Sequence, residues 1–140
     1  MPSSRTRRCR RKGTTMVEMA FIAPVFLTLV MGIIEASRLG MVSQLLTTAA
    51  REGCRVAVID GMTQTDVQNR IDAVLSGSGI SVGTITPTCP SPYSWDSAPS
   101  GTPITVSVSV PYNQVSWLPT PYFLNGAVVS CSATMSSERP

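Results

Sequence analysis

The stretch "RRCRRKGTTMVEMAFIAPVFLTLVMGIIEASR" (residues 7–38) decides the fold of this 140-residue chain. A basic run is followed by Gly13 and then by an apolar run that contains one carboxylate, Glu18. Residues 19–34 carry no charge, and a helix needs about 20 apolar residues to cross a bilayer core. The stretch therefore predicts a transmembrane helix over residues 14–35, with Glu18 near one end.

Positive charge is concentrated before the apolar run. Six of the eleven basic residues lie within residues 5–12, while residues 14–140 hold five basic residues against eight acidic ones. This asymmetry predicts a basic leader over residues 1–13 that stays in the cytoplasm, with the rest of the chain periplasmic or extracellular. It argues against nucleic-acid binding, because the basic run has no aromatic or folded platform around it.

Two simpler interpretations compete with a processed membrane helix. A cleaved secretory signal peptide fits the basic and apolar regions, but Glu35 stands where the cleavage motif needs a small residue. A plain uncleaved anchor fits better, because the helical pattern continues past that point. Small or apolar residues recur there with helical spacing, at Leu39, Val42, Leu46, Ala49, Gly53 and Val56.

This spacing predicts an amphipathic extension over residues 36–61, with Asp60-Gly61 as the stop signal. The row Ala49, Gly53 and Ala57 would let another element approach the helix closely.

The remainder, residues 62–140, is expected to be an extracytoplasmic α+β domain. A capping-box pattern over residues 65–68 predicts a short second helix that ends at Gly77. Alternation is clean over residues 104–110 and 127–135 and weak over residues 80–84, which predicts strands. The expected fold is thus a long helix whose outer half packs on a small antiparallel sheet.

The residue inventory argues against an enzyme. The chain has no histidine, so it lacks histidine-based nucleophiles and Cys/His zinc sites. No metal and no cofactor is expected. Cys9 lies in the basic leader on the predicted cytoplasmic side, and the other three cysteines lie on the periplasmic or extracellular side, where disulfides can form. We expect one bridge, Cys89–Cys131, with a bridge from either residue to Cys54 as the alternative.

Three motifs together resemble the TadE-like minor pilins of the tight-adherence pilus, a branch of the type IV pilin-like proteins. The first is Gly13 with Glu18 five places on, followed by Pro24 and "GIIE", although Met19 stands where the family commonly has an aromatic residue. The second is "LTTAAREGCRVAV" (residues 46–58), and the third is "ATMSSE" (residues 133–138).

The resemblance implies that a prepilin peptidase cuts after Gly13 and frees the amine of Thr14. Glu18 would pair with that amine, in its own chain or in a neighbouring subunit, and so set the packing register. A buried carboxylate without a partner is costly, and pairing recovers much of that cost. The alternative is that Glu18 is merely tolerated at the headgroup boundary.

The expected function is that of a minor pilin or pilus-assembly subunit, acting in assembly, surface adhesion or secretion. Its expected partners are other pilin subunits, pilus-assembly membrane proteins and the peptidase. The alternative is a singly anchored binding module, with an aromatic loop around Trp117, Tyr122 and Phe123 as its ligand surface. Local core cover is the simpler role for that loop.

Overall fold

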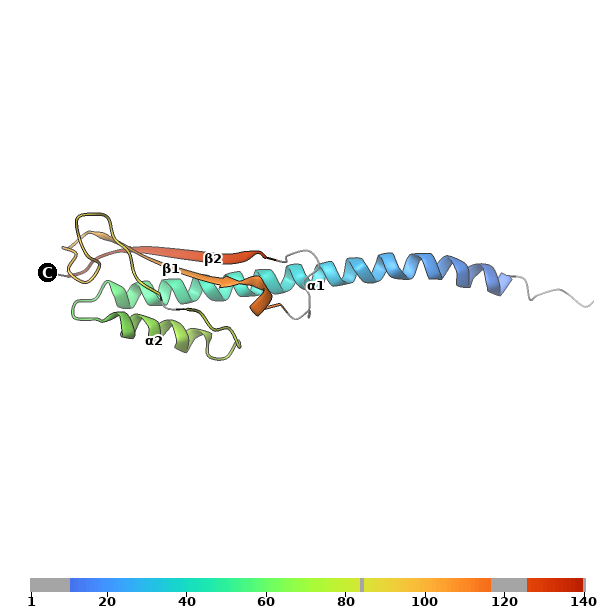
Figure 1. Cartoon of the computed structure of the whole chain (residues 1–140), viewed down its shortest axis with the longest axis horizontal. Coiled ribbons are helices and arrows are strands. Elements are labelled where there is room, and N and C mark those ends of the chain that lie inside the picture. Colours follow the sequence, from blue (N-terminus) through green and yellow to red (C-terminus); the bar gives the residue numbers. More distant parts are fainter. Residues whose placement is uncertain (1–10, 84, 117–125, 140) are drawn as a thin grey trace, which may run out of the picture. The chain divides into compact units, whose positions relative to one another are not determined.

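The computed structural model describes residues 11–83, 85–116 and 126–139, and it confirms the α+β class. The element order is α1 (Arg11–Ala57), α2 (Gln64–Leu75), β1 (Pro103–Pro111), a 3-10 turn (Tyr112–Gln114) and β2 (Val128–Ser136) (Figure 1). Contacts divide the chain between Ile34 and Glu35 into an N-terminal unit and an outer unit, residues 35–140.

Helix α1 spans slightly different bounds from those expected. It begins at Arg11 rather than near Thr14, and it ends at Ala57, four residues before the end of the predicted extension at residue 61. Gly61 follows with a φ of 77°, the left-handed conformation expected of a residue after a helix end. Pro24 lies inside the helix, and the Thr28 hydroxyl donates to the Pro24 carbonyl at 2.8 Å.

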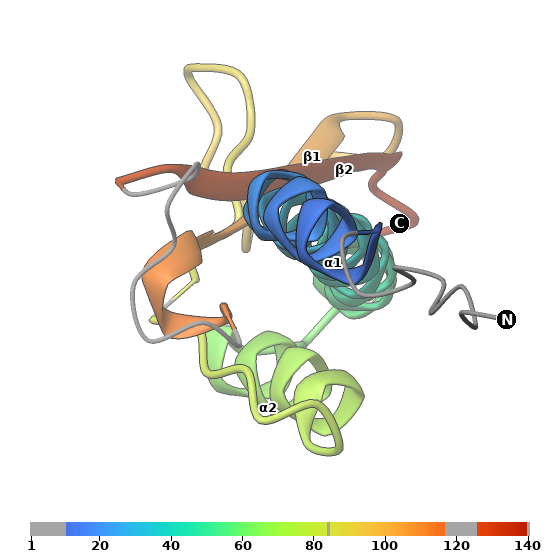
Figure 2. The same ribbon diagram turned by 90° about the vertical axis from the view of Figure 1, so that its right-hand side faces the viewer.

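The outer half of α1 has the predicted amphipathic character. Val42, Leu46 and Ala49 are fully buried, and Ser37 and Arg51 are exposed on another face. In the two views, α2 lies along one side of this half-helix and the β1–β2 sheet along another (Figure 2). The half-helix is therefore the centre of the hydrophobic core of the outer unit.

Helix α2 is capped two residues earlier than expected. Thr63, not Thr65, is the N-cap, and the capping box joins Thr63 to Asp66. The backbone N–H of Thr63 donates to the Asp66 carboxylate at 2.8 Å, and its hydroxyl donates at 2.6 Å. These hydrogen bonds, the hydroxyl's first, hold the pKa of Asp66 below its ordinary value. The prediction failed because Thr63-x-x-Asp66 offers a competing box with a shorter acidic side chain.

Strands β1 and β2 pair antiparallel along their whole lengths, from Pro103 opposite Ser136 to Pro111 opposite Val128. The predicted alternation is confirmed, because Ile104, Val106, Val108 and Val110 are buried while Ser107 and Ser109 are exposed. On the outward face the Thr105 and Thr134 hydroxyls lie 2.8 Å apart. The sheet thus presents one apolar face to α1 and one hydroxyl-rich face outward.

The weak alternation over residues 80–84 does not produce a strand, so that prediction was wrong for the residues described. Side chains satisfy the backbone there: Ser78 Oγ accepts from Ile80 N, and Gln68 Oε1 accepts from Ile85 N. Among the described residues of this segment, Thr88 joins the sheet, through an isolated bridge to Thr105. Within the described ranges the sheet therefore has two strands.

Candidate membrane helix and processing site

The N-terminal unit exposes its apolar side chains. Met16 and Phe21 are each 76% exposed and Val25 is 70% exposed. In the described part of the chain, α1 is the one helix long and apolar enough to cross a membrane, and its apolar window has no buried side chain. Such a surface is costly in water but favourable in lipid. It is consistent with a single-pass membrane protein.

Gly13 and Thr14 lie in the first turns of α1, and both are exposed. A Cβ atom added at Gly13 would meet nothing within 4 Å, so no described side chain shields this peptide bond. Because the bond is helical, a peptidase would have to unwind this end of α1 before cutting. Helix ends fray readily, which makes that unwinding inexpensive.

Glu18 lies one helical turn after Thr14, and it is exposed among apolar side chains such as Val17 and Met19. It has no ion-pair or hydrogen-bond partner within the described residues. A helix brings residues four apart onto the same face, so Glu18 and Thr14 are neighbours on the helix surface. Glu18 is thus placed for a partner at or near residue 14.

A buried polar cluster that the local sequence does not predict marks the start of the outer unit. Glu35 is 2% exposed and Arg38 is 8% exposed. The Tyr112 hydroxyl donates to the Glu35 carbonyl at 3.0 Å, and Arg38 Nε donates to the Val115 carbonyl at 2.8 Å. Burial, then the nearby Glu35 charge, raises the pKa of Tyr112. The cluster ties the turn after β1 to the residues that follow the apolar helix.

The carboxylate of Glu35 is unusual within this cluster. Both of its oxygens are buried without a hydrogen-bond partner in the described residues. The one available sequence signal was the spacing of Glu35 and Arg38, which places two charges on the face that otherwise carries Val42 and Leu46. Residues of the turn that follows β1 contact both positions.

The row Ala49, Gly53 and Ala57 is buried in the outer unit. A Cβ atom at Gly53 would lie 2.7 Å from Ile71 Cδ1 of α2 and 3.6 Å from Val106 Cγ1 of β1. The missing side chain therefore makes room for α2 and the sheet of the same chain.

Arg139 closes the other end of the outer unit. It is 4% exposed, and its guanidinium donates to the Ala57 carbonyl at 3.0 Å and to the Trp95 carbonyl at 2.7 Å. The guanidinium also lies 5.9 Å from the centre of the Trp95 ring. One C-terminal residue thus satisfies the last turn of α1 and fixes the proline-rich loop around residue 95.

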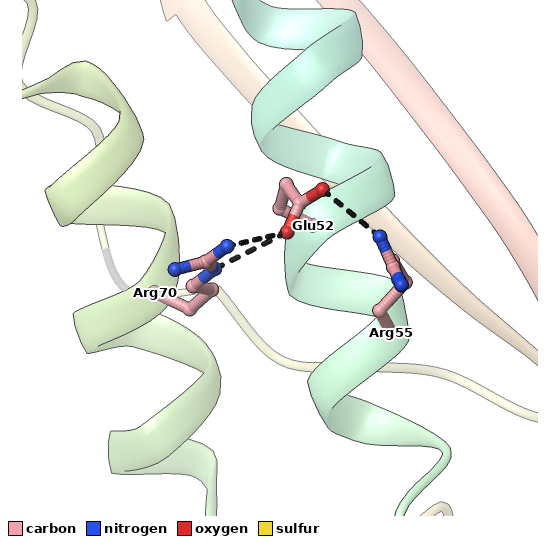
Figure 3. A network of polar contacts seen from close by, with 3 residues as sticks. All are labelled: Glu52, Arg55 and Arg70. Atoms are coloured by element: carbon pink, nitrogen blue, oxygen red, sulfur yellow. Dashed lines mark hydrogen bonds and ion pairs between the residues drawn. The ribbon is translucent and has the colours of Figure 1, made fainter.

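Glu52 links the two helices at the surface. Its carboxylate accepts from Arg70 of α2 at 2.7 Å and from Arg55 of α1 at 3.5 Å (Figure 3). Both arginines are more than half exposed at their side chains. Exposed pairs of this kind contribute about 0–1 kcal/mol. The contact orients α2 and holds no group in an activated state.

The three outer cysteines are free thiols, so the expected disulfide is not confirmed. Cys54 donates to the Ile104 carbonyl at 3.3 Å, Cys89 to the Tyr93 carbonyl at 2.9 Å, and Cys131 to the Ser43 carbonyl at 3.5 Å. Cys131 lies on β2, opposite Val108, whereas Cys89 follows the bridge on the far edge of β1. The strand between them separates the two sulfurs.

Two groups of residues lie outside the described ranges. They are Cys9 of the basic leader and the aromatic residues Trp117, Tyr122 and Phe123, which the sequence offered as a ligand surface or as core cover. Among the residues that are described, no three His, Cys, Asp or Glu side chains come together as a metal site would require.

Comparison with known proteins singles out the long helix. A family model described as TadE-like protein matches residues 13–55. The match begins at Gly13, includes Glu18 and the apolar segment, and continues into the packed half of α1. No curated protein and no solved structure matches the chain.

Proposed function

We propose, from the TadE-like identity of residues 13–55, that the chain is a minor pilin or assembly subunit of a tight-adherence pilus. The match itself indicates a protein associated with that pilus. The observation that carries the finer proposal is the placement of Gly13, Thr14 and Glu18 on one exposed, apolar helix that starts the matched segment. The outer unit then acts through protein contacts rather than as a catalyst.

In this proposal a prepilin peptidase cuts after Gly13 and removes the basic leader. Removal releases positive charges that hold the N-terminus at the cytoplasmic leaflet. The new Thr14 amine is cationic and lies one turn from Glu18. Neighbouring subunits packed in register pair the two charges, whereas subunits packed out of register leave a carboxylate unpaired in an apolar environment.

The proposed partners are other pilin subunits, membrane proteins of the assembly machinery and the peptidase. The proposed location is a single-pass membrane protein with a cytoplasmic leader and an outer unit in the periplasm or outside the cell. Adhesion or secretion would follow from the pilus as a whole. The exposed apolar helix supports both membrane storage and helix packing within a fibre.

Replacement of one carboxylate separates assembly from membrane insertion. Glu18→Gln should leave insertion intact, because it removes a charge from an apolar helix. It should reduce recovery in sheared fibres or cross-linked assemblies, because an amide attracts an ammonium group far less than a carboxylate does. Asp72→Asn is the matched control, since Asp72 is an exposed carboxylate of α2 that accepts hydrogen bonds from Gln68 of the same helix.

The comparison is made on membrane extracts and sheared fibres from the same cells. Unchanged assembly with Gln at position 18 would support a tolerated boundary charge. Absence of the normal chain from every pilus fraction and assembly complex would instead favour the singly anchored binding module.

A further inference from the structure

The backbone hydrogen bonds of Thr105 reveal which way each edge of the sheet faces. Thr105 N donates to the Thr88 carbonyl at 2.7 Å, and Thr88 N donates to the Thr105 carbonyl at 2.8 Å. The backbone groups of Thr105 therefore point away from β2. Thr134 lies opposite Thr105, so its N–H and C=O point away from β1.

The direction in which the backbone N–H and C=O groups point alternates from one residue to the next along each strand. At the two ends of the ladder, Tyr112 N donates to the Ala127 carbonyl and Ser137 N donates to the Thr102 carbonyl, each at 2.8 Å. The even-numbered residues of β1 and the odd-numbered residues of β2 therefore point their backbone groups at the other strand. The outer edge of β1 consequently belongs to Pro103, Thr105, Ser107, Ser109 and Pro111. The outer edge of β2 belongs to Val128, Ser130, Ser132, Thr134 and Ser136.

The outer edges of β1 and β2 differ in how well they are protected from pairing with another strand. On β1, two of the five edge positions are prolines without an N–H, and Thr105 is already paired with Thr88. On β2, all five edge positions are exposed, and they include no proline and no charge. No strand pairs with this edge in the described ranges. Proteins usually block such edges with proline, lysine, bulges or cover, so the β2 edge is open to strand addition.

We propose that the β2 edge binds the same edge of a second copy of this chain, antiparallel, about a twofold axis through Ser132. Antiparallel pairing sets edge residues directly opposite one another. In this register Ser132 faces the partner's Ser132, Ser130 faces the partner's Thr134, and Val128 faces the partner's Ser136. All five edge residues of each copy are then paired, and none is left over.

The four-stranded sheet that results is closed. Its order is β1-β2 of one copy followed by β2-β1 of the other, and its two outer edges are the proline-blocked edges of β1. A third copy meets only the β1 edges, where two of the five positions lack an N–H and Thr105 is already paired, so the association stops at a dimer. The paired side chains are small and uncharged, and they introduce no like-charge contact across the twofold.

The burial of the inward side chains also supports pairing at the β2 edge. The inward residues of β1 are fully buried, whereas Cys131, Ala133 and Met135 on the inward face of β2 are only partly buried. A twofold axis perpendicular to the sheet keeps both α1 helices on one face. A second β2 would therefore cover the side of these residues that the single chain leaves open.

The pairing also fixes the direction of the two copies. Within the outer unit β2 runs along α1 in the same sense, since Cys131 contacts Ser43 and Glu138 N donates to the Val58 carbonyl. Antiparallel strands therefore give residues 35–57 of the two α1 helices opposite directions in the dimer.

Cysteine pairs test the register on the full chain in detergent. Ser130→Cys and Thr134→Cys are purified separately, mixed and oxidised, and the products are mapped by mass spectrometry. Directly opposed Cα atoms are about 5.5 Å apart, within disulfide range. Two copies of position 130 would be roughly 13 Å apart, beyond it. We expect bridges between residues 130 and 134 in the mixture and none between like positions; bridges between like positions, or none at all, would overturn the proposal.

Proline at the twofold provides a second, independent measurement. Ser132→Pro removes the N–H donor of both copies at the axis without touching the β1–β2 ladder. Loss of two hydrogen bonds should weaken dimerisation about tenfold in sedimentation of the full chain. Ser107→Pro is the matched control, because it removes an edge-facing N–H on β1. Equal effects of the two substitutions, or no effect of either, would contradict the dimer while leaving the pilus role untouched.

Discussion

The hydroxyl of Tyr112 donates to the backbone carbonyl of Glu35 at 3.0 Å, across a sequence separation of 77 residues. This hydrogen bond joins the turn after β1 to the first residue of the outer unit. Arg38 reinforces it by binding the carbonyl of Val115. Tyr112 and Arg38 therefore hold the first residues of the outer unit against the turn after β1, although no local sequence motif links them.

Tyr112→Phe should lower the free energy of unfolding of the chain by about 1 kcal/mol at neutral pH, the usual net value of one hydrogen bond. The difference should shrink at high pH. Burial raises the pKa of Tyr112, so the unfolded chain ionises first, near its ordinary value of about 10. The stabilisation that the neutral phenol provides is fully present below this pH. It is lost as the pH rises through the higher pKa that Tyr112 has in the folded chain.

The measurement is denaturant unfolding of both proteins in detergent, followed by circular dichroism at neutral pH and above pH 10. A constant difference at all pH values would argue that Tyr112 ionises equally well in the folded chain. Equal stability at neutral pH would argue that the hydrogen bond contributes nothing.

The contact between Gly53 and Ile71 offers a test of the core. Gly53→Ala places a methyl group 2.7 Å from Ile71 Cδ1, which a packed core resists at a cost of about 1–3 kcal/mol. Gly40→Ala is the matched control on the same helix, where an added Cβ meets nothing within 4 Å. That substitution should stabilise the helix by up to about 1 kcal/mol, because alanine favours helices over glycine.

Thermal unfolding of the two variants and of Gly53→Ala/Ile71→Val separates packing from helix propensity. The double variant removes the Cδ1 atom and should recover part of the lost stability. If Gly53→Ala is as stable as Gly40→Ala, the close approach of α2 to α1 is wrong.

The cap of α2 can be assigned by a pair of threonine substitutions. Thr63→Ala should destabilise α2 by about 1 kcal/mol, because it removes the N-cap hydroxyl. Thr65→Ala should have little effect, because Thr65 lies inside the helix. The hydrogen bonds from Thr63 lower the pKa of Asp66 in the folded chain. The ionised carboxylate therefore contributes to stability above the ordinary pKa of an aspartate, and this contribution is lost as the pH falls through the lower pKa of the folded chain.

The effect of Thr63→Ala should accordingly shrink in acid. Melting curves of both variants at neutral and acidic pH provide the comparison. A larger effect from Thr65→Ala would restore the cap expected from the sequence.

The sequence predicted those elements whose side-chain period is strong. The apolar run before Glu35 and the stripe from Val42 to Gly53 both form the expected helix, and the alternating segments form β1 and β2 as expected. The cap of α2 was misplaced because two overlapping threonine boxes compete within four residues. The strand at residues 80–84 failed because its backbone groups find side-chain partners in Ser78 and Gln68 instead of a neighbouring strand.

The buried charges could not be predicted from local sequence. Glu35, Arg38 and Arg139 have ordinary surface residue types, and each is covered by a segment far along the chain. The protection of the β1 edge likewise depends on where Thr88 meets the sheet, which leaves the β2 edge as the open one. Such long-range arrangements follow from topology, which the periodic pattern of one segment does not fix.

The N-terminal residue of the mature chain tests the central claim most directly. The normal chain and Gly13→Val are isolated from the membranes of a host that has a prepilin peptidase, and their intact masses and N-terminal sequences are determined. The pilin account predicts a normal chain that begins at Thr14 and a Gly13→Val chain that keeps the basic leader. A normal chain that retains residues 1–13, despite an active peptidase in the same cells, would contradict it.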